Sequence, residues 1–226
     1  MRAVVVAPVP DPLDLILVAH EAFRRDLAGI DRAARAAAHG DHGLGAVVGR
    51  HEFFGEMLAW HAHGEDVGIF PALAPHAPHI VAAYELDHRG LDVAIDGLAA
   101  AVASGDAIDI ARATIACKFH LDMHLYKEEV DLYAVFARLL SPDAQGAAVR
   151  AFTDALPADR FGDFVRWLFP LVDLDDQEKV ARVWHSAMPA PMFTGALQLV
   201  ENTLGDKYLV LSARLTDIVS SENKGA

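Results

Sequence analysis

The chain is poor in cysteine and in positive charge, and each shortage excludes a class of protein. Cys117 is its one cysteine, so neither an internal disulfide nor a multi-cysteine zinc site can form. Nineteen lysines and arginines face 32 aspartates and glutamates, which gives a formal net charge of −13. Because nucleic-acid backbones and anionic membrane surfaces attract basic proteins, we expect neither as a partner.

Long uncharged apolar runs are also missing. None approaches the roughly 20 residues that a membrane-spanning helix needs, and residues 1–10 lack the apolar core of a signal peptide. These absences, with the single cysteine, predict a cytoplasmic protein. Hydrophobic residues nonetheless make up 53% of the chain, which is ample material for a buried core.

Apolar residues recur at steps of three and four along four segments, the pattern of one helix face. The four stripes span residues 16–34, 47–69, 81–102 and 110–139, and short loops with proline or glycine separate them. Long amphipathic helices joined by short loops are typical of an up-down-up-down four-helix bundle. The sequence therefore predicts an all-α protein with such a bundle over residues 11–140.

Residues 141–226 should form a helical C-terminal extension. Helices are expected from Ser141-Pro142, from Pro157 and over residues 175–188, and a last apolar stripe covers residues 193–218, with a break expected at Gly205. An apolar stripe must be buried against something. We expect the extension to pack on the bundle or on a partner subunit, which makes it a candidate homodimer contact.

Each of the four bundle stripes carries a histidine near its middle, out of 12 histidines in the chain. Two of these histidines have a glutamate one helical turn later, and side chains four residues apart are neighbours on a helix surface. The resulting six candidate ligands are His20, His61, Glu65, His88, His124 and Glu128.

The candidate ligands repeat along the chain. A shift of 63 residues places His61 on His124, Glu65 on Glu128 and Asp66 on Glu129, and a shift of 68 residues places His20 on His88. The bundle therefore consists of two similar helical hairpins. A pseudo-two-fold axis between them would bring all six side chains to one level of the core.

Four imidazoles and two carboxylates at one level of a core are costly unless cations compensate them. Two carboxylates can bridge two metal ions, and two imidazoles can complete each side. Nitrogen and oxygen donors without sulfur favour iron, with manganese and zinc as weaker candidates.

The motifs WHAHGEDVGIFPAL (residues 60–73) and MHLYKEEVDLYAVF (residues 123–136) resemble the metal-binding helices of the hemerythrin-like, HHE cation-binding family. The resemblance implies a non-haem di-iron centre with an oxo or hydroxo group between the two irons. His20 and His61 would bind one iron and His88 and His124 the other, while Glu65 and Glu128 would bridge them.

Two features differ from the oxygen-carrying hemerythrins and are similar to the broader bacterial HHE branch. Asp92 stands where the carriers have a second histidine, and Glu128 follows its histidine by four residues where they have an aspartate at five. We expect Asp92 to form an ion pair with Arg24, with metal ligation or solvent exposure as alternatives. His120, one turn before its ligand histidine, is expected to support the site from outside or to ligate.

Three functions remain open at this point. The centre would bind a small ligand such as oxygen, nitric oxide or peroxide, or belong to a di-iron oxidase, oxygenase or peroxide-decomposing enzyme, or be structural only. An enzyme needs a substrate pocket, and aromatic residues of the extension could wall one: Trp167, Phe169, Trp184 and Phe193.

Overall fold

The computed structural model describes residues 11–41 and 43–218, so residues 219–226 of the predicted extension lie outside it. This described part contains helices and no strand, which confirms the all-α fold class. The chain forms two compact units, whose boundaries fall inside α1 (Leu13–Ala38) and α8 (Phe161–Leu171). We call residues 20–164 the bundle unit, and residues 11–19 with 165–218 the C-terminal unit.

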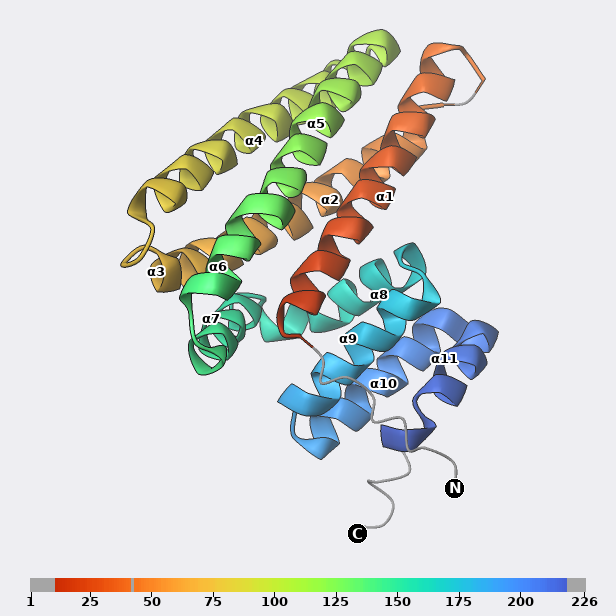
Figure 1. The fold of residues 1–226 in the computed structure, drawn as a ribbon. Coiled ribbons are helices and arrows are strands. Elements are labelled where there is room, and N and C mark those ends of the chain that lie inside the picture. Colours follow the sequence, from red (N-terminus) through yellow and green to blue (C-terminus); the bar gives the residue numbers. More distant parts are fainter. Residues whose placement is uncertain (1–10, 42, 219–226) are drawn as a thin grey trace. The chain divides into compact units, whose positions relative to one another are not determined.

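The bundle unit contains α1 from His20 onward and the other three long helical segments that the sequence predicts (Figure 1). Two are uninterrupted, and two contain a π-helical segment (η1, η2) before a final α-helical piece. In chain order they are α1; α2 (Gly45–Gly64), η1 (Glu65–Ile69) and α3 (Phe70–Leu73); α4 (Pro78–Ser104); and α5 (Ala107–Lys127), η2 (Glu128–Leu132) and α6 (Tyr133–Leu139).

Local sequence explains the turn between α4 and α5, which run side by side. Gly105 ends α4 in a left-handed conformation (φ 73°), which glycine adopts without steric cost. The Asp106 carboxylate then accepts hydrogen bonds from the backbone N–H groups of Ile108 and Asp109 and caps α5. This two-residue connection makes the two helices antiparallel.

The π-helical segments change which residues face the core, and the fourth predicted stripe is wrong beyond η2. In each, a backbone N–H bonds five residues back: Phe70 to the Glu65 carbonyl, and Tyr133 to the Glu128 carbonyl. The extra residue in the turn moves the buried face by one position. Predicted inward-facing residues at 135 and 139 are therefore half-buried and exposed, while Tyr133 and Phe136 are buried.

The first helix after residue 140, α7 (Pro142–Asp154), belongs to the bundle unit. Proline after the Ser141 cap starts it, as the sequence predicts. It contacts α2, η1, α3 and α6, and its main contact is with η1. An element outside the predicted four-helix bundle thus lies directly on one of the two π-helical segments.

The C-terminal unit is built from the end of α8, α9 (Leu174–Ala187), α10 (Ala190–Leu204) and α11 (Tyr208–Arg214). Both α10 and α11 pack against α9. Gly205, with φ 57°, lies between them, which confirms the expected break in the last apolar stripe. One face of that stripe is buried, including Phe193, Val200 and Leu211.

Of the helices in the described residues, none combines the length and apolar character required to cross a membrane.

Candidate metal centre

The six candidate ligands meet in the core of the bundle unit, each from the helix on which the sequence places it. His20 comes from α1, His61 from α2 and His88 from α4, while His124 lies near the end of α5. The two glutamates are the first residues of η1 and η2. All six are buried: His20, Glu65 and Glu128 are 0% exposed and the other three at most 7%.

The six side chains form two overlapping groups of four, each compact enough to hold one metal ion. One group is His20, His61, Glu65 and Glu128, and the other is Glu65, His88, His124 and Glu128. Within each group one ligand atom per residue lies within 4.8 Å of all the others. The two glutamates belong to both groups, so they lie between the two positions.

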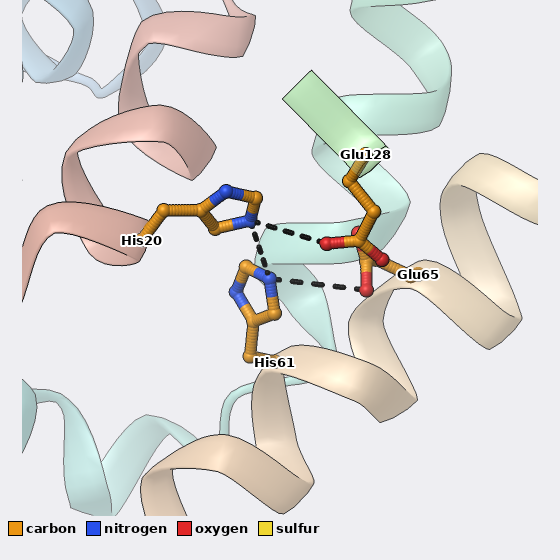
Figure 2. Close-up of side chains that lie close together, drawn as sticks. All are labelled: His20, His61, Glu65 and Glu128. Carbon is orange, nitrogen blue, oxygen red and sulfur yellow. Dashed lines mark hydrogen bonds and ion pairs between the residues drawn. The ribbon is translucent and has the colours of Figure 1, made fainter. Parts of the chain in front are cut away.

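Figure 2 shows the first group, with the two imidazoles facing the two carboxylates. The Nε2 atoms of His20 and His61 lie 3.1 Å apart and point toward each other. Oε2 of Glu128 is 3.6 Å from His20 Nε2, and Oε2 of Glu65 is 3.8 Å from His61 Nε2. Four donor atoms of the types that iron accepts therefore face a common point.

The second group has the same plan on the other side of the glutamates. Oε2 of Glu65 lies 3.2 Å from His88 Nε2. Oε1 of Glu128 lies 3.0 Å from His124 Nε2 and 3.7 Å from His88 Nε2. The two oxygens of Glu128 thus face different groups, and Oε2 of Glu65 is within 4 Å of a histidine in each.

Several of these atoms are buried without a hydrogen bond. They are Oε2 of Glu65, Nε2 of His88, Nδ1 of His124 and both carboxylate oxygens of Glu128. A buried polar atom without a partner costs about 1–3 kcal/mol, and more when charged. All of these atoms except Nδ1 of His124 point toward the two candidate metal positions. Cations there would compensate the unpartnered atoms, so the donor set fits a pair of metals.

Carboxylates outside the two groups hold the lone histidines of α1 and α4. Nδ1 of His20 lies 3.0 Å from Oε1 of Glu129, and the same oxygen accepts a 2.8 Å hydrogen bond from Arg24. Nδ1 of His88 lies 3.2 Å from Oδ1 of Asp66. A carboxylate at Nδ1 fixes the ring and leaves Nε2 directed at the metal position.

The supporting acids are functional residues that sequence reasoning did not assign. The sequence contained a signal for them, because the 63-residue shift places Asp66 on Glu129, and each directly follows one of the two candidate ligand glutamates. Each acid reaches the lone histidine of a different helix. The two differ in their surroundings, since Glu129 is paired with Arg24 while the Asp66 side chain is 49% exposed.

Tyr133 is a second residue that the sequence did not indicate. Its hydroxyl donates a hydrogen bond to Oε1 of Glu65 from the first position after η2. The residue at the corresponding place after η1 is Phe70, which lacks a hydroxyl and stacks on the His88 ring at 5.2 Å. Burial and the nearby Glu65 charge raise the pKa of Tyr133 well above its ordinary value, so the hydroxyl keeps its proton.

Burial and mutual contacts shift the pKa values of the clustered histidines and glutamates in different directions. Burial, aided by His20, lowers the pKa of His61, whereas burial and Glu128 raise the pKa of Glu65. Burial alone would lower the pKa of His88, but contacts with the two glutamates outweigh it and raise the pKa to about 10. The pKa of Glu128 is lowered, since contacts with His124 and His88 exceed the opposing effect of burial.

Two expectations about neighbouring residues are wrong. Arg24 pairs with Glu129 and not with Asp92, which is exposed and belongs to neither metal group. The buried face of α4 continues from His88 through Leu91 and Leu98, so Asp92 lies beside this face and is exposed. His120 is also exposed, with its ring 6.1 Å from that of Phe119, so it does not support the site.

Aromatic rings surround the histidines and complete the walls of the site. The rings of Phe23 and Phe152 each have their centroid 5.3 Å from that of His61. Phe152 comes from α7. This helix therefore contacts both the π-helical segment η1 and a histidine of the site. Four aromatic residues that the sequence offers as a pocket wall are buried and belong to the C-terminal unit: Trp167, Phe169, Trp184 and Phe193.

A known protein family matches this chain, and its description agrees with the fold and the candidate metal centre. The model of the hemerythrin HHE cation binding domain matches residues 11–136, more than half of the chain. The chain therefore belongs to this family, whose domain binds metal cations. The matched range includes the four long helical segments up to residue 136 and all six buried histidine and glutamate ligand candidates.

Curated relatives are larger proteins. The chain is 24% identical over 214 residues to "Zinc finger protein BRUTUS" of Arabidopsis thaliana, covering 91% of this chain and 17% of the relative. It is 26% identical over 182 residues to "Zinc finger protein BRUTUS-like At1g74770" of the same plant, covering 75% and 14%. The chain thus spans about a sixth of these relatives, and the first alignment extends well beyond residue 136. No solved structure matches the chain.

Proposed function

We propose that this chain is a non-haem di-iron protein that binds a small ligand, such as oxygen, nitric oxide or peroxide, at its metal centre. His20 and His61 would hold one iron, His88 and His124 the other, and Glu65 and Glu128 would be shared. The observation that carries the proposal is that six buried ligand candidates form two groups around common points, and that three of their carboxylate oxygens and Nε2 of His88 have no hydrogen-bond partner there.

The protein's own contribution is to hold the ligand atoms in place and to exclude water. Bound iron would supply positive charge, open coordination positions and one-electron redox chemistry. Glu129 and Asp66 fix the rings of His20 and His88, and phenylalanine rings line the histidines. A fully buried site of this kind suits a small ligand better than a bulky organic one.

A di-iron oxidase, oxygenase or peroxide-decomposing enzyme is the second candidate. It is favoured by the Tyr133 hydroxyl, which holds a proton at a carboxylate shared by both metal positions. Such a proton source is useful to an enzyme that reduces oxygen or decomposes peroxide. The same hydroxyl can also serve only to hold the Glu65 carboxylate in place. It therefore does not require an enzyme, and we keep ligand binding as the first proposal.

One set of measurements tests both functions. Elemental analysis of carefully prepared protein should find about two irons per chain. Absorption spectra should then be recorded in air, after dithionite, and with nitric oxide or peroxide. Reversible spectral changes with oxygen or nitric oxide support binding, whereas rapid catalytic loss of peroxide supports the enzyme. One metal ion or none per chain would contradict the di-iron assignment.

The remaining expectations concern location and partners. A cytoplasmic location, the absence of a nucleic-acid partner and a homodimer through the extension stay predictions. The strongly acidic composition supports the second of these. Light scattering of the full chain at several concentrations tests the homodimer.

A further inference from the structure

The two shared glutamates differ in how many oxygens they have free for metals. Neither oxygen of Glu128 has a hydrogen-bond partner. Its Oε1 lies 3.0 Å from His124 Nε2, and its Oε2 lies 3.6 Å from His20 Nε2. Each oxygen of Glu128 therefore faces one of the two metal positions, the arrangement of a carboxylate that bridges through both oxygens.

Glu65, in contrast, has only one carboxylate oxygen without a hydrogen-bond partner. Its Oε1 accepts the hydrogen bond from the Tyr133 hydroxyl, while Oε2 has no partner. Oε2 lies 3.2 Å from His88 Nε2 and 3.8 Å from His61 Nε2. The one available oxygen is thus nearer to the histidine of the second group than to that of the first.

The difference follows from a break in the internal repeat. The residue after η1 that corresponds to Tyr133 is Phe70, which cannot donate a hydrogen bond to Glu128. Because η2 inserts one residue, Tyr133 faces the core one position later in the sequence than the regular helical period would place a core residue. Both the hydroxyl and its direction are therefore specific to one half of the site.

We propose that Tyr133 is a positioning residue that makes the two metal positions unequal, by holding one oxygen of Glu65 so that only Glu128 bridges through both oxygens. The proposal rests on the proposed di-iron function. A hydrogen bond to a carboxylate restricts its rotation and draws negative charge away from the metal. The position beside His88 and His124 receives the nearer oxygen of Glu65 and binds its metal more tightly.

The test compares Tyr133→Phe with Tyr84→Phe in the full-length chain. Both remove one tyrosine hydroxyl, but that of Tyr84 donates its hydrogen bond to the backbone carbonyl of Lys127 at 2.7 Å. Iron(II) is titrated against a chromophoric chelator to obtain two dissociation constants. Mössbauer spectra of the ⁵⁷Fe-loaded proteins report the environment of each iron.

We expect two unequal dissociation constants and two distinct iron environments in the natural protein. Tyr133→Phe should keep both irons, change the ratio of the two constants by about 10-fold and alter at least one iron signal, because Glu65 gains a second free oxygen. Tyr84→Phe should leave both observables unchanged. Tyr133→Phe with the natural ratio and spectrum overturns the proposal.

Two further outcomes are distinguishable from that failure. If the natural protein binds fewer than two irons, the di-iron function itself fails, whatever the variants do. If Tyr133→Phe does not fold, as circular dichroism would show, ultraviolet resonance Raman spectra of the natural iron-loaded protein decide. The contact is supported if the natural protein shows the signal of a tyrosine that donates a strong hydrogen bond and Glu65→Ala lacks that signal. Identical spectra of the two proteins overturn it.

Discussion

Gly68 and Phe152 lie so close that no side chain fits at position 68. A Cβ atom placed on Gly68 would be 2.6 Å from the backbone nitrogen of Phe152 and 2.5 Å from the carbonyl oxygen of Ala148. Gly64, one turn earlier, is similarly close to the Phe152 ring. Glycine at the end of α2 and within η1 lets their backbones approach α7, and this contact places Phe152 beside His61.

Gly68→Ala should therefore destabilise the protein, although alanine normally favours helices. The added methyl group meets backbone atoms that cannot rotate away, and overpacking of this kind costs about 1–3 kcal/mol. Gly97→Ala on α4 is the matched control because nothing lies within 4 Å of its Cβ position. It should stabilise the protein by about 0.5–1 kcal/mol. Denaturant unfolding of the metal-free variants checks both, and equal effects would contradict the role of the close contact.

Glu129→Gln should weaken iron binding about 10–100-fold, as loss of a carboxylate behind a metal-ligating histidine usually does. Arg24→Gln should have a smaller effect because the Glu129 carboxylate remains at Nδ1 of His20. Asp92→Asn on the exposed face of α4 serves as the control and should change nothing. Competition titration with a chelator gives the ranking. A metal loss confined to Asp92→Asn would restore the ligand role that the structure denies it.

Glu128→Ala should remove both metals, because each oxygen of Glu128 faces a different metal position. Glu65→Ala should remove at least one. Each substitution should also lower the melting temperature of protein prepared with iron, since metal binding stabilises the folded state. Elemental analysis and thermal unfolding provide the measurements. A variant that keeps both irons and full stability shows that its glutamate is not shared.

Cys117 should not react with thiol reagents in the folded protein. Its side chain is 0% exposed, and burial raises the pKa of the thiol to about 12. At pH 8 only about one molecule in 10⁴ would carry the reactive thiolate, compared with about one in four for an ordinary cysteine. Modification by a chromogenic disulfide should therefore follow global unfolding in denaturant. Rapid modification of the native protein at pH 8 would contradict this burial.

The hairpin repeat and the six candidate ligands were predictable because local sequence encodes them. A helix face is set by a 3.6-residue period, so histidine and glutamate four residues apart must share a face wherever the helix lies. The same period failed beyond Leu132, because the π-helical turn that begins at Glu128 inserts one residue. Nothing in the two short segments EDVGI and EEVDL marks that insertion by composition alone.

Local patterns in the chain were enough to establish the all-α class, the four long helical segments and the identity of the residues that meet in the core. The residues that support this core became known from the folded chain alone. Arg24 and Glu129 are 105 residues apart, and Tyr133 and Glu65 are 68 apart. Contacts at such separations depend on the rotation and register of packed helices, which no local pattern specifies. A shift of a single residue in one π-helical turn is enough to bring a tyrosine to a ligand carboxylate.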